Sequence, residues 1–219
     1  MPFAYCMNEG ACTYIVHSKH RFVQLIAVSM TIPSNQKKTK PLTMSVLCLG
    51  PKYSGKTHLL TKLTKSQLGE NATSPHIVPT IGTNIFSIKL PAKQKTTTKQ
   101  KSSVYAQVRE VGGTMAPMWK NYLNDVRKLM YVVDTSNLCQ ISAAGVLLYS
   151  LLADPRLQHA KVIIVLTKMD LAYRQMRNEA LLMLQLEKLK KQIRQEVTVV
   201  ETSAILDTGK EKILDWLAS

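Results

Sequence analysis

The sequence predicts an α/β fold in which a six-stranded, mostly parallel sheet carries helices on both faces. Short apolar runs alternate with helix-like segments from Met44 to the end of the chain, a pattern typical of parallel sheets. Several of these runs are almost entirely apolar, as expected for strands that are buried on both faces. The six predicted strands span residues 45–49, 85–90, 104–111, 129–133, 162–166 and 197–200.

Helical segments separate these runs and close the chain. They span residues 56–68, 141–152, 180–194 and 210–217. In the third segment, Leu182, Leu186, Leu189 and Ile193 recur at helical spacing, so their side chains are expected to face the core.

Length and composition favour one domain with an appendage. Of 219 residues, 45% are hydrophobic, which is enough for a single core. We expect that domain to span residues 44–219, and residues 1–43 to form a poorly ordered N-terminal extension. No run reaches the roughly 18 apolar residues of a membrane span, and Pro2 excludes N-myristoylation at this start. The four cysteines form no CxxC pair, which favours free thiols in a reducing compartment. We expect a cytoplasmic protein whose association with membranes is at most peripheral.

The formal net charge of +15 raises the question of a nucleic-acid partner. About half of the excess lies in two stretches, residues 1–43 and 91–101, which together hold nine basic residues and one acidic residue. Neither stretch interleaves aromatic residues with its lysines, as a surface for stacking bases would. We therefore expect solvated loops here, and no binding of nucleic acid.

A nucleotide-binding motif follows the first predicted strand and opens the first helix. It matches the pattern GxxxxGK[ST], in which backbone N–H groups of a glycine-bearing loop cradle phosphates. The lysine can then reach the β- and γ-phosphates, and the last hydroxyl can bind Mg²⁺. The predicted nucleotide-binding residues here are Gly50, Pro51, Lys52, Tyr53, Ser54, Gly55, Lys56 and Thr57.

Two later motifs indicate that the base is guanine. Thr167, Lys168 and Asp170 belong to a TKMD sequence directly after a buried strand, where the carboxylate can accept both N–H groups of guanine. Ser203 and Ala204 belong to an ETSA sequence after the last strand, where a backbone N–H can donate to the guanine oxygen. All three motifs follow predicted strands, so they are expected to meet at one edge of the sheet.

Two further segments are predicted to sense the γ-phosphate. Pro79 to Gly82 offers Thr80 as a second hydroxyl ligand for Mg²⁺, and a strand ends in Gly112 and Gly113, where a backbone N–H can approach the phosphate. The predicted metal site therefore consists of Thr57 and Thr80, with Glu110 acting directly or through water.

Taken together, these motifs resemble the small GTPase superfamily, and within it the Arf-like branch, over residues 44–219. The Arf-like character rests on PTIGTN at residues 79–84, on VGG followed by Pro117, Met118 and Trp119, and on LMYVVD at residues 129–134. The resemblance implies binding of GTP and GDP with Mg²⁺, and an interswitch hairpin that shifts between two states. It also implies effector proteins that read the GTP form, an exchange factor and an activating protein, and roles in membrane and ciliary traffic.

The departures from the family pattern concern hydrolysis. Glu110 stands where the family has Asp, and Thr114 stands where it has the glutamine that orients the attacking water. No glutamine lies between Gln107 and Gln140, so the catalytic residue is unknown and intrinsic hydrolysis is expected to be slow. Lys52 and Tyr53 are bulkier than the residues usual at those two positions.

Three functions remain open at this point. The first is a regulatory GTP switch with weak or partner-dependent hydrolysis. The second is a pseudo-GTPase scaffold that binds nucleotide permanently or poorly, which Glu110 and Thr114 favour. The third is an ATP-using P-loop kinase, although the sequence offers no visible acceptor site or lid and the TKMD and ETSA sequences would then be coincidences.

Overall fold

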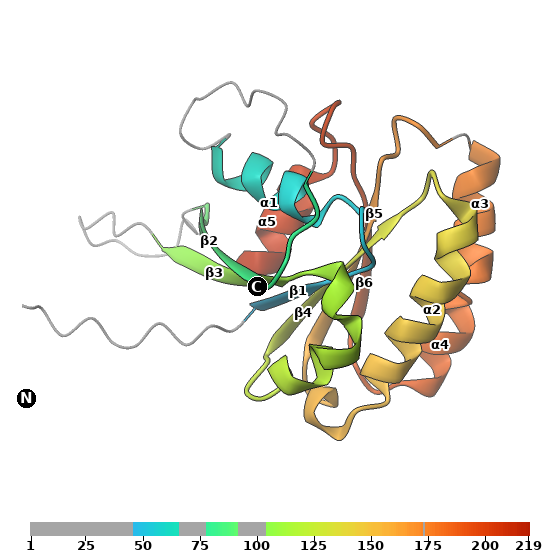
Figure 1. Cartoon of the computed structure of the whole chain (residues 1–219), viewed down its shortest axis with the longest axis horizontal. Helices are drawn as coiled ribbons and strands as arrows, with labels where there is room; N and C mark the ends of the chain where they lie inside the picture. The colour runs from blue at the N-terminus through green and yellow to red at the C-terminus, as the bar shows by residue number, and fades with distance from the viewer. Residues whose placement is uncertain (1–45, 66–77, 92–103, 173) are drawn as a thin grey trace, which may run out of the picture. The chain divides into compact units, whose positions relative to one another are not determined.

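The computed structural model describes residues 46–65, 78–91, 104–172 and 174–219. All of the described elements lie in one compact unit, Pro41–Ser219. Six strands form a single sheet in the order β2-β3-β1-β4-β5-β6 (Figure 1). The strands are β1 (Val46–Leu49), β2 (Thr83–Lys89), β3 (Tyr105–Val111), β4 (Lys128–Asp134), β5 (Lys161–Thr167) and β6 (Val197–Glu201). Only β2 runs antiparallel to its neighbour, β3, so the predicted fold class is confirmed.

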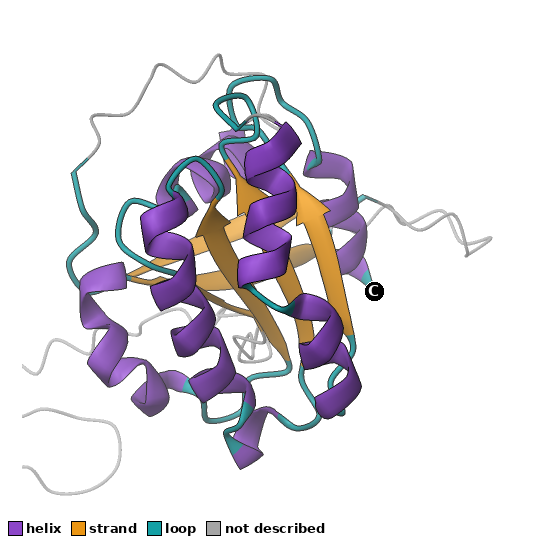
Figure 2. Cartoon of the chain, turned by 90° about the vertical axis from the view of Figure 1, so that its right-hand side faces the viewer, coloured by secondary structure: helices purple, strands orange, loops and turns teal. Residues whose placement is uncertain are grey.

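Helices cover both faces of this sheet. α1 and α5 pack on one face, and α2, α3 and α4 on the other (Figures 1 and 2). They are α1 (Lys56–Lys65), α2 (Leu138–Leu152), α3 (Arg174–Met183), α4 (Leu186–Gln192) and α5 (Lys210–Ala218), with 3₁₀ segments η1 (Gly113–Tyr122) and η2 (Pro155–Leu157).

The central strands explain why the core has two halves. In β4, Leu129, Tyr131 and Val133 point toward the α2 side, whereas Met130 and Val132 point toward the α1 side. This alternation is the period of two that a strand imposes on its side chains. Because both halves need apolar residues, β4 is apolar along most of its length, and its carboxyl end is held in place from both faces.

The helix predicted over residues 180–194 is interrupted, and that prediction is wrong. Gln185 has a positive φ of 46° and separates α3 from α4. The change of direction at Gln185 brings Leu184 and Leu186 into the core, where a continuous helix would have placed Leu182. Leu182 is instead 77% exposed, so its predicted place in the core is also wrong.

Some predictions fall on parts of the chain that the structure does not describe. These are the N-terminal extension 1–43, residues 66–68 of the predicted first helix, and most of the lysine-rich segment 91–101. Within the described residues, none of the helices combines the length and the apolar character needed to cross a membrane.

Candidate nucleotide-binding site

The turn between β1 and α1 forms the centre of the candidate site. Backbone atoms approach Gly50 so closely that a Cβ there would lie 2.2 Å from the carbonyl oxygen of Val132, so only glycine fits. Gly55 has a φ of +85°, a conformation that glycine adopts without strain. The turn is thus held to the carboxyl end of β4 at its start and enters α1 at its end.

Lys56 lies inside this turn. Its Nζ donates to the carbonyl oxygens of Gly50 at 2.9 Å and of Pro51 at 2.8 Å, and its side chain is almost fully buried. Burial lowers the pKa of Lys56. A phosphate at this turn would lie near the Lys56 ammonium and near the N-terminus of α1, both of which favour an anion.

Three oxygen-bearing side chains from distant segments meet beside Lys56. The Oγ1 atoms of Thr57 and Thr80 are 2.9 Å apart, and the Thr57 hydroxyl donates to Oε1 of Glu110 at 2.6 Å. Asn84 donates to the other carboxylate oxygen of Glu110 at 3.3 Å. Hydroxyl and carboxylate oxygens are the ligands that Mg²⁺ prefers, so these residues fit the ion that a triphosphate would bring.

The two glycines after β3 are required by close contacts. A Cβ at Gly112 would lie 2.3 Å from the carbonyl oxygen of Thr80, and a Cβ at Gly113 would lie 2.3 Å from the backbone nitrogen of Lys52. The N–H of Gly112 donates to the carbonyl oxygen of Gly82 at 2.9 Å. The segment around Thr80 and the segment around Gly113 therefore contact each other, and the second one also contacts the phosphate-binding turn.

These segments enclose a cavity of about 380 Å³. It is lined by Lys52, Tyr53, Gly55, Lys56, Thr57, His58, Val78, Pro79, Thr80, Glu110, Gly113 and Lys168. Thr114, at the position where the family has glutamine, is exposed and is not among the lining residues.

Hydrogen bonds fix the loop after β5 to its surroundings. The hydroxyl of Thr167 donates to the carbonyl oxygens of Ser54 at 2.7 Å and of Val133 at 3.0 Å. Lys168 has a φ of +58°, and its Nζ pairs with Asp134 at 2.6 Å. The loop is therefore tied to the phosphate-binding turn on one side and to the end of β4 on the other.

A second cavity, of about 340 Å³, lies beside this loop and holds the predicted base-binding residues. It is lined by Gly55, His58, Leu59, Thr167, Lys168, Asp170, Leu171, Thr202, Ala204 and Ile205. Ser203 donates its hydroxyl to Asp170 at 2.5 Å, which fixes the carboxylate in this position. Asp170 and Ala204 thus line the same cavity.

Three further residues were missed in the sequence. His58 lines both cavities, and burial, with a smaller contribution from Lys62, lowers its pKa. Asp134 anchors Lys168, and Gln140 donates from α2 to the carbonyl oxygen of Lys52 at 3.1 Å. His58 follows the motif directly, so its position next to Thr57 is a signal that could have identified it. Gln140 is far from Lys52 in the sequence, and nothing local indicates their contact.

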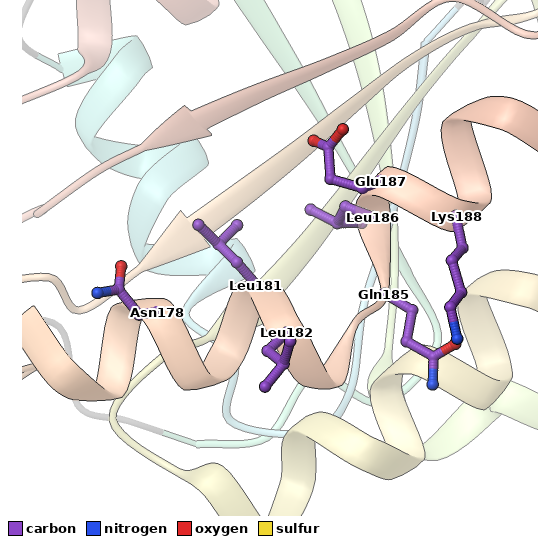
Figure 3. Close-up of a pocket in the computed structure, with 7 residues that line it drawn as sticks. All are labelled: Asn178, Leu181, Leu182, Gln185, Leu186, Glu187 and Lys188. Carbon is purple, nitrogen blue, oxygen red and sulfur yellow. The ribbon is translucent and has the colours of Figure 1, made fainter.

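A larger cavity, of about 490 Å³, lies between α3 and α4, away from these residues (Figure 3). Three leucines and four polar or charged residues line it: Asn178, Leu181, Leu182, Gln185, Leu186, Glu187 and Lys188. It has no glycine-bearing turn and no cluster of phosphate-binding groups. We therefore place the candidate site at the carboxyl edge of the sheet, where ligands of open α/β sheets bind.

Comparison with known proteins gives a consistent result. Residues 30–219 match the sequence model of the ADP-ribosylation factor family. The chain is 33% identical to ADP-ribosylation factor-like protein 16 of Homo sapiens over 175 residues, which cover 78% of this chain and 83% of that protein. It is 29% identical to ADP-ribosylation factor 3 of Arabidopsis thaliana, over 80% of this chain and 86% of that protein.

A similar solved structure is that of the Arl6 BBS3 small GTPase from Trypanosoma brucei with the bound nucleotide analogue GppNp. The TM-score is 0.61 at 19% identity, and the match covers 79% of this chain and 94% of that chain. At this identity the likeness concerns the fold.

Proposed function

The chain belongs to the ADP-ribosylation factor family, and from this premise we propose that it is a Mg²⁺-dependent GTP/GDP switch that hydrolyses GTP slowly without a partner. An Arf-like small GTPase binds guanine nucleotide and acts as a switch. To this family-level function the proposal adds a bound Mg²⁺ ion, the residues that bind the nucleotide and the ion, and slow hydrolysis of GTP.

The meeting of Thr57, Thr80 and Glu110 carries the proposal. Thr57 belongs to the phosphate-binding turn, Thr80 to the first γ-phosphate segment and Glu110 to β3. The Thr57 hydroxyl is nevertheless within hydrogen-bond distance of both the Thr80 hydroxyl and the Glu110 carboxylate. Both hydroxyls would hold the Mg²⁺ ion that comes with the triphosphate, and the two segments would then be linked through it. Loss of the γ-phosphate would leave Thr80 without that link, which is the basis of a two-state switch.

Slow hydrolysis follows from what surrounds the γ-phosphate position. Phosphoryl transfer depends on positioning and on charge, and the attacking water needs a side chain that orients it. Thr114 has a short side chain, is exposed and does not line the cavity. A partner that supplies the missing group would then control the lifetime of the GTP form.

Exposed apolar side chains beside the site suit an effector surface. Ile81 on the first segment, Val78 just before it, Ile85 in β2 and Met118 in η1 are all exposed, with Ile81 at 89%. Such side chains next to a switch are typical of a protein-binding surface. We propose that effectors, an exchange factor and an activating protein act on this face, in membrane or ciliary traffic. The protein itself would be cytoplasmic or peripheral on membranes, with residues 1–43 as an extension of the 44–219 domain.

The test is a set of equilibrium affinities for GTP, GDP and ATP, each with and without Mg²⁺. We expect guanine nucleotides to bind and ATP not to compete with them. The affinity for GTP should depend on Mg²⁺ more than the affinity for GDP does. Hydrogen exchange in residues 79–84 and 111–119 should be slower in the GTP form than in the GDP form. Equal binding of ATP and GTP would contradict the assignment of Asp170.

A pseudo-GTPase scaffold is the second candidate, favoured by the absence of Thr114 from the cavity lining. The same measurements separate the two. A scaffold would show the same hydrogen exchange with GTP and GDP, and its GTP affinity would not respond to Mg²⁺.

A further inference from the structure

Two bulky residues, Lys52 and Tyr53, stand in the middle of the phosphate-binding turn, and no contact with phosphate has so far been assigned to their side chains. Both line the phosphate cavity, and both side chains are exposed at its rim. The Nζ of Lys52 lies 4.8 Å from the centre of the Tyr53 ring, within the range of a cation–π contact. Tyr53 has a φ of +63°, which is uncommon for a residue other than glycine, so its position has a conformational cost.

The backbone of Lys52 is held between two other segments. Gln140 of α2 donates to its carbonyl oxygen at 3.1 Å. Gly113 packs so closely that a Cβ there would lie 2.3 Å from the Lys52 nitrogen. The backbone of Lys52 therefore lies next to Gly113, the glycine that is expected to approach the γ-phosphate. The flexible four-carbon side chain of Lys52 is long enough to turn into the same cavity.

The geometry points to Lys52 as a residue that binds the terminal phosphate of GTP and raises the preference for GTP over GDP. This inference rests on the proposed function and adds the regulation of the same site. Lys56 approaches the phosphates from inside the turn and Lys52 from the rim, so the two ammonium groups would contact different oxygens. When the terminal phosphate is absent, the Lys52 ammonium contacts the Tyr53 ring instead.

Only the triphosphate gains from this arrangement. Gly113 and Lys52 lie side by side, so a phosphate near the Gly113 N–H is also near Lys52, whereas GDP has no group at that place. Because Lys52 is exposed, its attraction to phosphate is screened by salt more strongly than that of buried Lys56. The contribution of Lys52 is therefore expected to fall as the ionic strength rises.

The experiment compares Lys52→Met, which removes the charge and keeps most of the stem, with Lys52→Arg, which keeps the charge. GTP and GDP affinities are measured by equilibrium titration of the full chain with Mg²⁺, at low and at high salt. Lys52→Met should weaken GTP binding about tenfold, the loss expected for one charge-assisted hydrogen bond at its weaker end, and change GDP binding much less. Lys52→Arg should retain most of the preference for GTP.

Lys212→Met is the matched control, because Lys212 is an exposed lysine on α5 away from the cavity. It should leave both affinities and their salt dependence unchanged. An unchanged GTP/GDP ratio in Lys52→Met, or an equal loss for both nucleotides, would overturn the inference while leaving the proposed function intact. If the unmodified chain binds neither nucleotide, the proposed function itself fails.

Discussion

The proposed guanine end and the proposed γ-phosphate end of the site differ in where their residues lie in the fold. At the guanine end, side-chain hydrogen bonds link Thr167, Lys168 and Asp170 to neighbouring strands and loops. At the γ-phosphate end, hydrogen bonds also link Thr80 to Thr57 and Gly112 to Gly82, but these segments lie outside the parallel part of the sheet and exposed apolar residues flank them. We propose from this difference that the base-binding residues are already in place without a ligand, whereas the γ-phosphate segments are held in place by the ligand.

The largest expected effect is at the guanine end. Asp170→Asn replaces a carboxylate that would accept two hydrogen bonds from guanine, each worth about 1.5–3 kcal/mol, so GTP and GDP affinities should fall by about 10²- to 10⁴-fold. Xanthine nucleotide should recover part of the loss, since its exocyclic oxygen can accept from the new amide. Titration with each nucleotide measures both effects. Asp215→Asn, an exposed carboxylate on α5, is the control and should bind like the unmodified chain.

The second prediction concerns the γ-phosphate end alone. Gly113→Ala places a Cβ where the Lys52 backbone nitrogen is 2.3 Å away, so the segment must move outward. Overpacking of this kind costs about 1–3 kcal/mol, and we expect GTP affinity to fall by about 5- to 150-fold with little change for GDP. The measurement is the GTP/GDP affinity ratio.

Gly145→Ala is the control for Gly113→Ala. A Cβ at Gly145 in α2 would lie 3.6 Å from a side-chain carbon of Leu184, an ordinary contact distance. This variant should keep the ratio of the unmodified chain. An equal loss of GTP and GDP binding in Gly113→Ala would indicate a general distortion of the turn and would remove the proposed distinction between the two ends.

A smaller effect is expected at the metal. Glu110→Gln removes the buried charge that accepts the Thr57 hydroxyl, and the Mg²⁺ concentration required for GTP binding should rise about tenfold, as for one charge-assisted hydrogen bond. GDP binding without Mg²⁺ should not change. Magnesium titrations of GTP binding and of GDP binding measure this effect. Glu211→Gln, at an exposed position on α5, is the control. If Glu110→Gln leaves the Mg²⁺ requirement unchanged, Glu110 has no role in holding the metal.

The smallest effect is expected for hydrolysis. Intrinsic turnover of the unmodified chain should be at or below ~10⁻⁴ s⁻¹, the scale of a switch GTPase without a partner. Thr114→Gln should raise it only slightly, because the side chain at this position lies outside the cavity. Single-turnover hydrolysis of the purified protein gives both rates. Fast turnover by the unmodified chain would mean that another residue positions the water.

The parts of the fold that the sequence predicts are those with local signals. β1, β4 and β5 are continuous apolar runs, and the phosphate-binding turn is a local motif between a strand and a helix. The break between α3 and α4 could not be predicted in this way, because the leucine spacing continues through Gln185 while the backbone there takes a left-handed conformation. Tertiary packing of Leu184 and Leu186 overrides the periodicity.

The same distinction applies to the site. The nucleotide motifs identify which residues to expect, and the parallel sheet explains why they lie at one edge. Contacts between segments far apart in the sequence, such as Gln140 with Lys52 and Asp134 with Lys168, leave no pattern in either segment. They depend on how α2 and the ends of β4 and β5 pack around the turn.

The buried ring of Trp119 gives the chain its own optical reporter. Its indole Nε1 donates to the carbonyl oxygen of Gly112 at 3.1 Å, and its ring meets Tyr131 edge to face at 6.3 Å. Any displacement of the peptide between Gly112 and Gly113 must change this indole hydrogen bond. The chain has one other tryptophan, Trp216, which packs on the opposite face of the sheet. Intrinsic emission, without a label, should therefore follow the movement of this segment in real time, with Trp216 as a constant background.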